Sequence, residues 1–323
     1  MTDKAVLGVE ADIGGTHARF AVAEMADGRL TLGRPKVLQT RDYPSLQEAF
    51  AAYAADLGER PRRAAFAVAG PVGQDDFKLT NSSWHFRQST LKDDLQLDGV
   101  WLVNDFAAIA HAVPHCAADD FQALGEVAFR LPGQGAISIV GPGTGLGVGL
   151  LVRHRHQDVV VPTEGGHAGF APPDSDGLAL LQSLLKQMPR VSAERVLCGD
   201  GLALVYKAVA AQPEASTPPD PIALWDAAIA GRDELAARAL DRWLVLLGMF
   251  AGDVALTQGA GAVVMAGGIL PRLGAARVAA PFLAGFCSKG RFTAAMKALP
   301  VAILATGQPG LMGAAALLKS HSV

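Results

Sequence analysis

The chain has 323 residues, which corresponds to one large or two medium domains and is long enough to bury a substantial core. Half of the residues are apolar and 18% are charged, with 36 Gly and 19 Pro. These proportions exclude a disordered, collagen-like or coiled-coil chain. The net charge of −3 provides no overall cationic field, so we expect no nucleic-acid partner and no membrane-surface partner.

Cysteine usage and the N-terminal sequence indicate the compartment. Cys116, Cys198 and Cys287 are isolated and odd in number, which disfavours a disulfide framework or a cysteine zinc site. The first residues lack the basic and apolar regions of a secretory signal. The longest uncharged stretches, 136–152 and 254–271, are interrupted by glycine, which favours buried strands and turns over membrane spans. We therefore expect a cytoplasmic protein.

The first third of the chain predicts an α/β domain. An apolar run at 5–12, the turn Gly14-Gly15-Thr16 and a second run at 19–24 form a strand–turn–strand pattern. The elements expected next are an extended segment at 30–38, a helix at 46–57, a buried strand at 63–70, a short helix after Trp84 and a strand at 100–105. Because helices alternate with strands after a meander, the sheet should be mixed.

The same opening pattern returns near residue 137. Strands at 137–140 and 148–152 flank the glycine-rich turn 141–145, and Gly143 aligns with Gly14. Two Gly-Thr turns are compatible with an internal duplication and also with coincidence. The elements expected downstream are a loop at 212–221, a helix at 232–257, strands at 262–266 and 301–305 and a terminal helix from 309.

Three glycine turns that follow apolar strands indicate phosphate binding. The first lies at 14–16, the second at 141–147 and the third at Gly267-Gly268. Unobstructed N–H groups in such turns can bind phosphate oxygens, and Asp12 and Thr16 add groups that suit hydrated Mg²⁺. Each turn alone is also compatible with an ordinary hairpin. The Rossmann and P-loop fingerprints are absent from the sequence.

A second set of polar residues suits a ligand with several hydroxyl groups. It comprises Asn104, Asp105, Glu164, His167 and Glu194. Asp105 can act as a general base or can merely cap a helix that begins near residue 106. Ser192 before Glu194 has the alternative role of a helix cap, and metal binding by His167 is disfavoured without further Cys or His nearby. Together the set offers the donors and acceptors that a sugar or polyol needs.

A series of motifs in chain order resembles the bacterial ATP-dependent glucokinase family. They are DIGGTHAR at 12–19, LTNSSW at 79–84, VNDF at 103–106, GPGTGLG at 141–147, EGGH at 164–167, VSAERV at 191–196, AGGI at 266–269 and PGLMG at 309–313. The resemblance spans essentially the whole chain. One departure is His17, since members of the family usually carry Asn at this position.

The resemblance implies a fold and an activity. The expected fold is α/β, the duplicated actin-like (ribonuclease H-like) ATPase fold, with two lobes, mixed sheets and an inter-domain cleft. A small domain would comprise 1–115 plus 305–323, and a large domain 116–304. The expected activity is MgATP-dependent phosphorylation of glucose to glucose 6-phosphate, by a cytoplasmic homodimer that feeds glycolysis. The alternatives are a hexose kinase of broader specificity and a non-catalytic actin-like ATPase scaffold.

The resemblance also implies roles for individual residues. Asp105 would be the base for the 6-hydroxyl and would bind the sugar together with Asn104, Glu164, His167 and Glu194. The residues expected at the ATP phosphates are Ala11, Asp12, Ile13, Gly14, Gly15 and Thr16 in the first turn, and Gly143, Thr144 and Gly145 in the second. Gly267 and Gly268 would lie near the adenosine. We expect no tightly bound metal, with Mg²⁺ held mainly through ATP and close to Asp12.

Overall fold

The computed structural model describes residues 5–58, 60–70, 72–79, 82–155, 157–210 and 220–321. The chain divides into two compact units. Unit 1 comprises residues 1–116 and 306–323, and unit 2 comprises residues 117–305. Within the described ranges, no helix combines the length and the apolar character that a membrane span requires.

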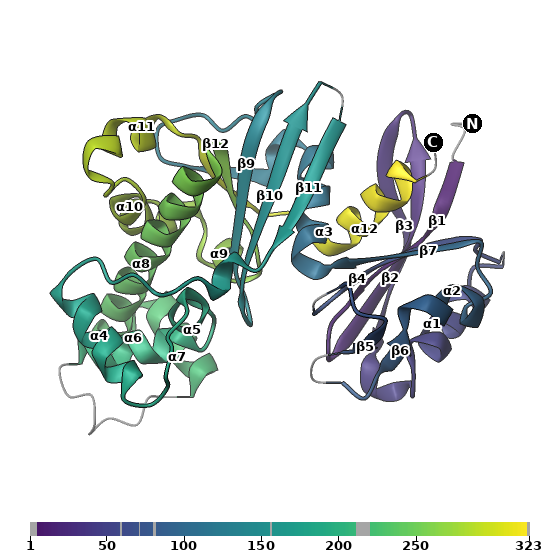
Figure 1. Ribbon diagram of the computed structural model, residues 1–323, viewed down its shortest axis with the longest axis horizontal. Coiled ribbons are helices and arrows are strands. Elements are labelled where there is room, and N and C mark those ends of the chain that lie inside the picture. Colours follow the sequence, from purple (N-terminus) through teal and green to yellow (C-terminus); the bar gives the residue numbers. More distant parts are fainter. Residues whose placement is uncertain are drawn as a thin grey trace. The chain divides into compact units, whose positions relative to one another are not determined.

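Unit 1 is built on a five-stranded mixed sheet with the order β3-β2-β1-β4-β7 (Figure 1). β1, β2 and β3 form an antiparallel meander, and β4 and β7 run parallel to β1. The strands are β1 (Ala5–Ile13), β2 (His17–Ala26), β3 (Arg29–Gln39), β4 (Arg63–Val68) and β7 (Gly99–Asn104). A separate hairpin consists of β5 (Asp76–Lys78) and β6 (His85–Arg87), and α2 (Gln88–Asp94) follows it.

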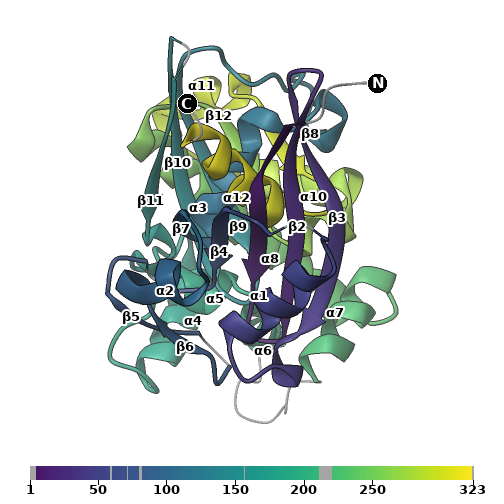
Figure 2. The ribbon, with the colours of Figure 1, turned by 90° about the vertical axis from the view of Figure 1, so that its right-hand side faces the viewer.

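Helices cover both faces of the unit 1 sheet (Figures 1 and 2). On one face, α1 (Leu46–Ala55) packs its aromatic side chains on the sheet, where Tyr53 stacks on Phe20 with ring centroids 5.2 Å apart. On the other face lie α12 (Pro309–Ser320) and α3 (Asp105–Ala112). These two helices touch because α12 has a glycine at their contact: a Cβ at Gly313 would lie 1.7 Å from the carbonyl oxygen of Ala108.

Unit 2 repeats the strand order of unit 1. Its sheet has the order β11-β10-β9-β12-β13-β8, in which β9, β10 and β11 form an antiparallel meander and β12 and β13 run parallel to β9. The strands are β8 (Phe121–Leu124), β9 (Gly135–Pro142), β10 (Leu146–His154), β11 (Gln157–Thr163), β12 (Ala260–Met265) and β13 (Val301–Leu304). Apart from the added strand β8, the two sheets have one topology, so the internal duplication is confirmed and coincidence is excluded.

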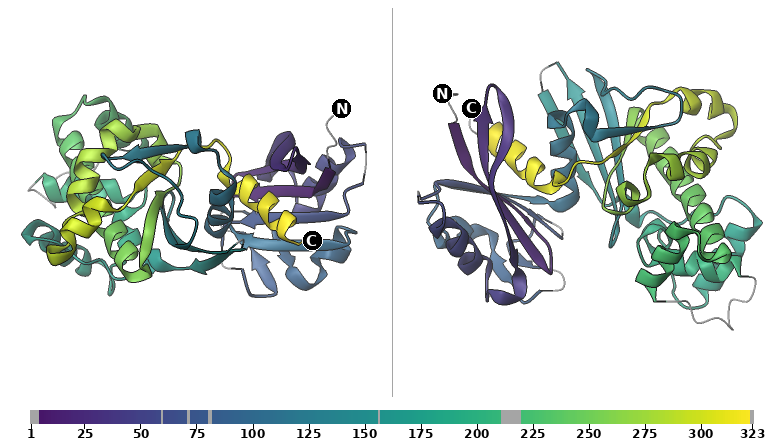
Figure 3. Two further views of the ribbon diagram at one scale, coloured as in Figure 1. Left: turned by 90° about the horizontal axis from the view of Figure 1, so that it is seen from above. Right: turned by 180° about the vertical axis from the view of Figure 1, so that it is seen from behind.

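Several helices of unit 2 contact one long helix, α8 (Glu234–Gln258) (Figure 3). α10 (Ala275–Phe286) lies against it, because Gly248 and Gly285 each leave room for a carbonyl of the other helix. A Cβ at either glycine would lie 2.0 Å from that oxygen. The remaining helices are α4 (Ser175–Leu185), α5 (Ala193–Leu197), α6 (Gly201–Val209), α7 (Pro221–Ala230), α9 (Ile269–Leu273) and α11 (Thr293–Ala298).

The predicted loop at 212–221 needs one correction. Residues 212–219 lie outside the described residues. Pro221 is not a loop residue, because it is the first residue of α7, and Asp220 caps this helix from outside by accepting a hydrogen bond from the N–H of Ala223. Proline is favoured at that position, where its missing N–H costs nothing.

Candidate active site

The first glycine turn joins β1 to β2, and its carbonyl groups are held by the protein. The N–H of Gly14 donates to His17 O at 2.9 Å, and the hydroxyl and N–H of Thr40 donate to Gly15 O at 2.6 Å and Thr16 O at 3.0 Å. Within the described residues, the N–H groups of Gly15 and Thr16 have no acceptor. The turn therefore offers these two donors to an anion, whereas Gly14 uses its own N–H to close the turn.

Asp12 lies next to this turn, against the start of α12. A Cβ at Gly310 would be 2.8 Å from Asp12 Cγ, so only glycine leaves room for the carboxyl group. Asp12 Oδ2 is 3.4 Å from Arg19 Nη1, and its side chain is 27% exposed. Burial raises the pKa of Asp12 above its ordinary value of 3.8, and the nearby Arg19 acts in the opposite direction. A cation beside Asp12 would offset this desolvation, so a hydrated Mg²⁺ fits the site.

Ala11 and Ile13 flank Asp12 on the strand. Their side chains are 0% and 1% exposed and belong to the apolar core of unit 1. Contacts of these two residues with a nucleotide are therefore restricted to the main chain.

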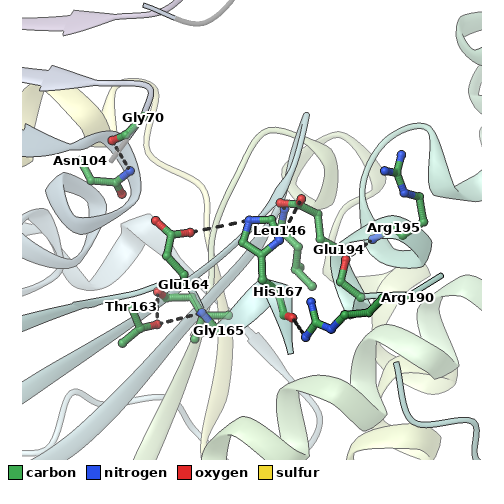
Figure 4. A network of polar contacts seen from close by, with 12 residues as sticks. Gly70, Asn104, Leu146, Thr163, Glu164, Gly165, His167, Arg190, Glu194 and Arg195 are labelled. Carbon is green, nitrogen blue, oxygen red and sulfur yellow. Dashed lines mark hydrogen bonds and ion pairs between the residues drawn. The ribbon is translucent and has the colours of Figure 1, made fainter. Parts of the chain in front are cut away.

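Asn104 and Asp105 lie where β7 passes into α3. Asn104 is the helix cap, since its Oδ1 accepts from the N–H of Phe106 at 2.9 Å and of Ala107 at 3.2 Å, and its Nδ2 donates to Gly70 O at 3.1 Å (Figure 4). α3 begins at Asp105, next to the expected position 106, and Asn104 is its N-cap. Asp105 Oδ1 also accepts from the N–H of Phe106 at 2.8 Å, so Asp105 contributes to capping α3 without being the N-cap residue. Its carboxylate lies at the end of a parallel strand, where α/β sheets bind ligands.

In unit 2, the EGGH motif forms a tight turn on β10. A Cβ at Gly166 would lie 1.9 Å from Leu146 O, and one at Gly165 would lie 2.9 Å from the side chain of Val148. Two glycines are therefore needed for the turn to approach the strand. The N–H of His167 closes the turn by donating to Glu164 O at 3.0 Å. This close packing fixes the main-chain positions of Glu164 and His167.

The chain after His167 brings α5 beside this turn. Ala193 N donates to Ala168 O at 2.8 Å, and Phe170 N donates to Val191 O at 3.0 Å. Ser192 caps α5 by accepting from the N–H of Arg195 at 3.3 Å, so the alternative role of Ser192 is confirmed. Ser192 can therefore cap α5 while Glu194 occupies the first turn of the same helix.

His167 lies between two carboxylates (Figure 4). Its Nε2 is 3.9 Å from Glu164 Oε2, and its Nδ1 is 3.7 Å from Glu194 Oε1. Arg190 donates to the carbonyl oxygen of His167 at 2.6 Å. The Glu164 side chain is 70% exposed and the Glu194 side chain 30% exposed, so both can reach a solute. The three groups form a polar cluster that can bond several neighbouring hydroxyls as donor and acceptor.

Glu194 also links this cluster to the second glycine turn. Its Oε2 accepts from the N–H of Leu146 at 2.9 Å, and a Cβ at Gly145 would lie 2.5 Å from the same oxygen. Gly199 N donates to Gly143 O at 2.8 Å, and Gly143 N donates to Gly145 O at 2.8 Å. Within the described residues, the N–H groups of Thr144 and Gly145 have no acceptor and resemble those of the first turn.

Two tryptophans hold the segment that carries Glu194. Trp243 Nε1 donates to Val196 O at 3.1 Å, and Trp225 Nε1 donates to Gly199 O at 2.8 Å. Their rings pack edge to face with centroids 5.3 Å apart. Because both rings are buried, α5 and the loop after it are supported from the core of unit 2.

The third glycine turn lies against the end of β9. Gly267 has a φ of +85°, and a Cβ there would lie 2.5 Å from Pro142 O. The N–H of Ala266 donates to Val140 O at 2.8 Å. Gly267 and Gly268 are therefore next to β9, the strand that leads into the second turn. This position suits neighbouring parts of one nucleotide site.

The sequence did not reveal several supporting residues. These residues hold the candidate groups across long sequence separations, which local sequence patterns do not report. They are Thr40, Arg190, Gly310 and the main chain of Leu146. Thr80 and Asn81 of the LTNSSW motif lie outside the described residues. In the described part of the chain, no group of three His, Cys, Asp or Glu side chains is arranged to hold a metal ion.

Comparison with known proteins agrees with this geometry. A family model described as glucokinase matches residues 9–321. The glucokinase of Zymomonas mobilis is 44% identical over 311 residues, which cover 95% of this chain and 96% of that protein. The crystal structure of a glucokinase from an Antarctic psychrotroph has a TM-score of 0.87 at 34% identity, covering 99% of this chain and 100% of that one.

A more distant structure shares the fold. A ROK-family glucokinase from Streptomyces griseus, in complex with glucose and AMPPNP, has a TM-score of 0.63 at 22% identity and covers 98% of this chain and 100% of that one. The repeated strand order and these neighbours show that the fold is the duplicated actin-like one, as expected. From its motifs, its fold and its similarity over nearly the whole length, the chain belongs to the glucokinase family.

Proposed function

We propose that this protein is a glucokinase that transfers the γ-phosphoryl group of MgATP to the 6-hydroxyl of D-glucose. Family membership supports this reaction. The observation that carries it is the position of Glu194, whose carboxylate contacts His167 on one side and the N–H of Leu146 in the second glycine turn on the other. An assembly scaffold that uses only ATP has no need of a polar cluster beside its phosphate turn.

The two glycine turns are the proposed phosphate-binding elements. Gly15, Thr16, Thr144 and Gly145 offer main-chain N–H groups to the phosphate oxygens. Asp12 would hold Mg²⁺ through water, and a bound Mg²⁺ would supply positive charge to the β- and γ-phosphates. Gly267 and Gly268 would approach the adenosine.

The polar cluster is the proposed sugar-binding element. Glu164, His167 and Glu194 would bond the sugar hydroxyls, with the carboxylates accepting and the imidazole donating. Asn104 retains one N–H of its amide for the sugar, because its Oδ1 caps α3 and its other N–H contributes to the bond with Gly70. A site built to bond hydroxyls rejects analogues that lack them more strongly than an apolar pocket does.

Asp105 is the proposed general base. The 6-oxygen of glucose forms the new bond to the γ-phosphorus, the bond from that phosphorus to the β–γ bridging oxygen breaks, and ADP leaves with the electron pair. The hydroxyl proton passes to the Asp105 carboxylate. Because Asn104 caps α3, the first-turn position of Asp105 does not require it to serve as the cap.

The setting of the enzyme follows from the same family. We propose a cytoplasmic homodimer that feeds glycolysis, in which unit 1 is the small domain and unit 2 the large domain. Asp12 and Asp105 belong to unit 1, and the polar cluster belongs to unit 2.

The experiment is a coupled assay of purified protein with several hexoses and phosphoryl donors. We expect glucose- and Mg²⁺-dependent formation of ADP and glucose 6-phosphate in equal amounts. Equal rates with mannose or fructose would favour the hexose kinase of broader specificity. ADP release that does not depend on any sugar would contradict the proposal and favour the scaffold.

A further inference from the structure

A cavity of about 670 Å³ lies in unit 1, and none of the residues that line it belongs to the proposed active site. It is lined by the first half of β1, the end of β2, the middle of β3, the chain after α1 and the start of β4. Four of the lining residues are arginines and two are acids, namely Arg34, Arg60, Arg62, Arg63, Glu24 and Asp98. The described lining residues thus carry an excess of two positive charges in a chain whose net charge is −3.

Irregular strand pairing builds this cavity. The register between β1 and β2 shifts between Val6 and Gly8, and the register between β2 and β3 shifts between Phe20 and Val22. The second shift places two residues of β3, Arg34 and Pro35, opposite the single residue Ala21 of β2. Bulges of this kind redirect a side chain that a regular strand would point elsewhere.

Arg34 is held in an unfavourable backbone conformation at this bulge. Its φ is +49°, in the left-handed region that residues with a Cβ rarely adopt. The hydroxyl of Tyr53 donates to Arg34 O at 2.8 Å, and Arg34 Nη1 donates to Leu57 O at 2.6 Å, just beyond α1. Strain that persists because its surroundings enforce it is typical of binding sites.

Arg34 and Arg60 each donate to a neutral acceptor in the part of the chain that the structure describes. Arg34 donates to a main-chain carbonyl and Arg60 to the side-chain amide of Gln96. Among the described residues, no carboxylate forms an ion pair with either guanidinium. Arg62 differs, because its Nε is 2.6 Å from Asp98 Oδ2. Both arginines line the cavity, and each keeps further N–H donors that an oxyanion could accept from.

We propose that this cavity binds a small molecule that carries a phosphate group. The volume is in the range of small-molecule sites, and a phosphate monoester carries a charge near −2 at neutral pH, which matches the excess of the walls. The site is separate from the first glycine turn, since the cavity lines the opposite half of β1, and six residues of strand span roughly 20 Å. It therefore binds its ligand independently of the ATP phosphates.

The test uses the full chain with its active site filled by glucose and AMPPNP. Inorganic phosphate is titrated at constant ionic strength, and the arginine Nε–Hε NMR resonances are followed. We expect saturable shifts for Arg34 and Arg60. Arg60→Gln, on an exposed segment, should weaken phosphate binding by about 10-fold or more, as loss of a charge-assisted hydrogen bond implies.

The matched control is Arg41→Gln, which removes the same charge from another exposed position of unit 1 and should leave binding within about twofold. Arg34→Gln should weaken binding as Arg60→Gln does, and thermal melting of each variant verifies folding. Absence of saturable shifts in the parent, or equal affinity in the parent and Arg60→Gln, would overturn the proposal. Tighter binding of malonate than of phosphate would overturn the assignment to phosphate.

Discussion

Gly145→Ala tests the link between the sugar cluster and the second glycine turn. A Cβ at this position would lie 2.5 Å from Glu194 Oε2, the oxygen that accepts from the N–H of Leu146. The carboxylate must move by roughly 0.5–1 Å to reach an ordinary contact distance. Because the displaced atom is at the end of a flexible side chain, we expect the free energy of unfolding to fall by less than about 1 kcal/mol.

The effect on glucose should be larger than the effect on stability. A charge-assisted hydrogen bond contributes about 1.5–3 kcal/mol, and its loss corresponds to roughly 10- to 150-fold in affinity. A shift of Glu194 weakens its bond to the proposed sugar and changes its distance to His167, now 3.7 Å from Oε1 to Nδ1. We therefore expect Gly145→Ala to raise the KM for glucose by about 10-fold or more.

Gly143→Ala is the matched control from the same turn. A Cβ there meets no atom within 4 Å, so Glu194 should remain in place. Initial rates measured over glucose concentration at saturating ATP compare the two variants, and thermal melting verifies their folding. If Gly145→Ala has a glucose KM within twofold of the parent, or if Gly143→Ala raises it equally, the inferred coupling is refuted.

Three further predictions concern single residues. His167→Ala should raise the glucose KM by about 10-fold or more while the ATP KM stays within about twofold, and equal changes in both constants would contradict a role in sugar binding. Asn104→Ala should lower the free energy of unfolding by about 1 kcal/mol through loss of the α3 cap, whereas Asn104→Asp should retain it; equal melting temperatures for both variants would contradict that role. Glu10 is fully buried, neither of its carboxyl oxygens has a hydrogen-bond partner among the described residues, and burial raises its pKa well above 4.5. Parent stability should therefore fall as the pH rises above 4.5, because the unfolded chain releases a proton that the folded chain keeps. Glu10→Gln should raise the melting temperature at neutral pH and lose this advantage near pH 4.5, and a constant difference across this range would contradict the account.

The sequence predicts the strand openings of both units well, because apolar runs around glycine turns are local signals. It does not predict α4, α6 and α7, and it indicates α5 only through Ser192 as a possible helix cap. α5 has only five residues, and α4 carries Leu178 and Leu185 on its exposed surface, which obscures the apolar face that identifies a helix. α6 begins at Gly201, where glycine is required because a Cβ would lie 2.0 Å from Val196 O.

In the candidate site too, local features can be predicted from the sequence, whereas contacts that depend on packing cannot. The sequence identifies Asp12, Asp105 and His167 as candidates for binding or catalysis. It does so because it shows both their residue types and their places close to the ends of predicted strands. The contact between Glu194 and Leu146 joins residues 48 positions apart and depends on the packing of α5, so no local pattern contains it. The choice between Asn104 and Asp105 as the cap of α3 depends on side-chain direction, which sequence spacing alone leaves open.

Asp105→Asn is the most direct test of the proposed reaction. The variant keeps the size of the side chain and removes its basicity. The α3 cap is retained, because Asn104 still supplies it and an amide oxygen at position 105 can still accept from the N–H of Phe106. We predict that kcat for glucose phosphorylation falls by on the order of 10² to 10⁴, while the calorimetric dissociation constant for glucose changes much less. A kcat within about fivefold of the parent, in a variant that melts at the parent temperature, would contradict the role of Asp105 as the general base.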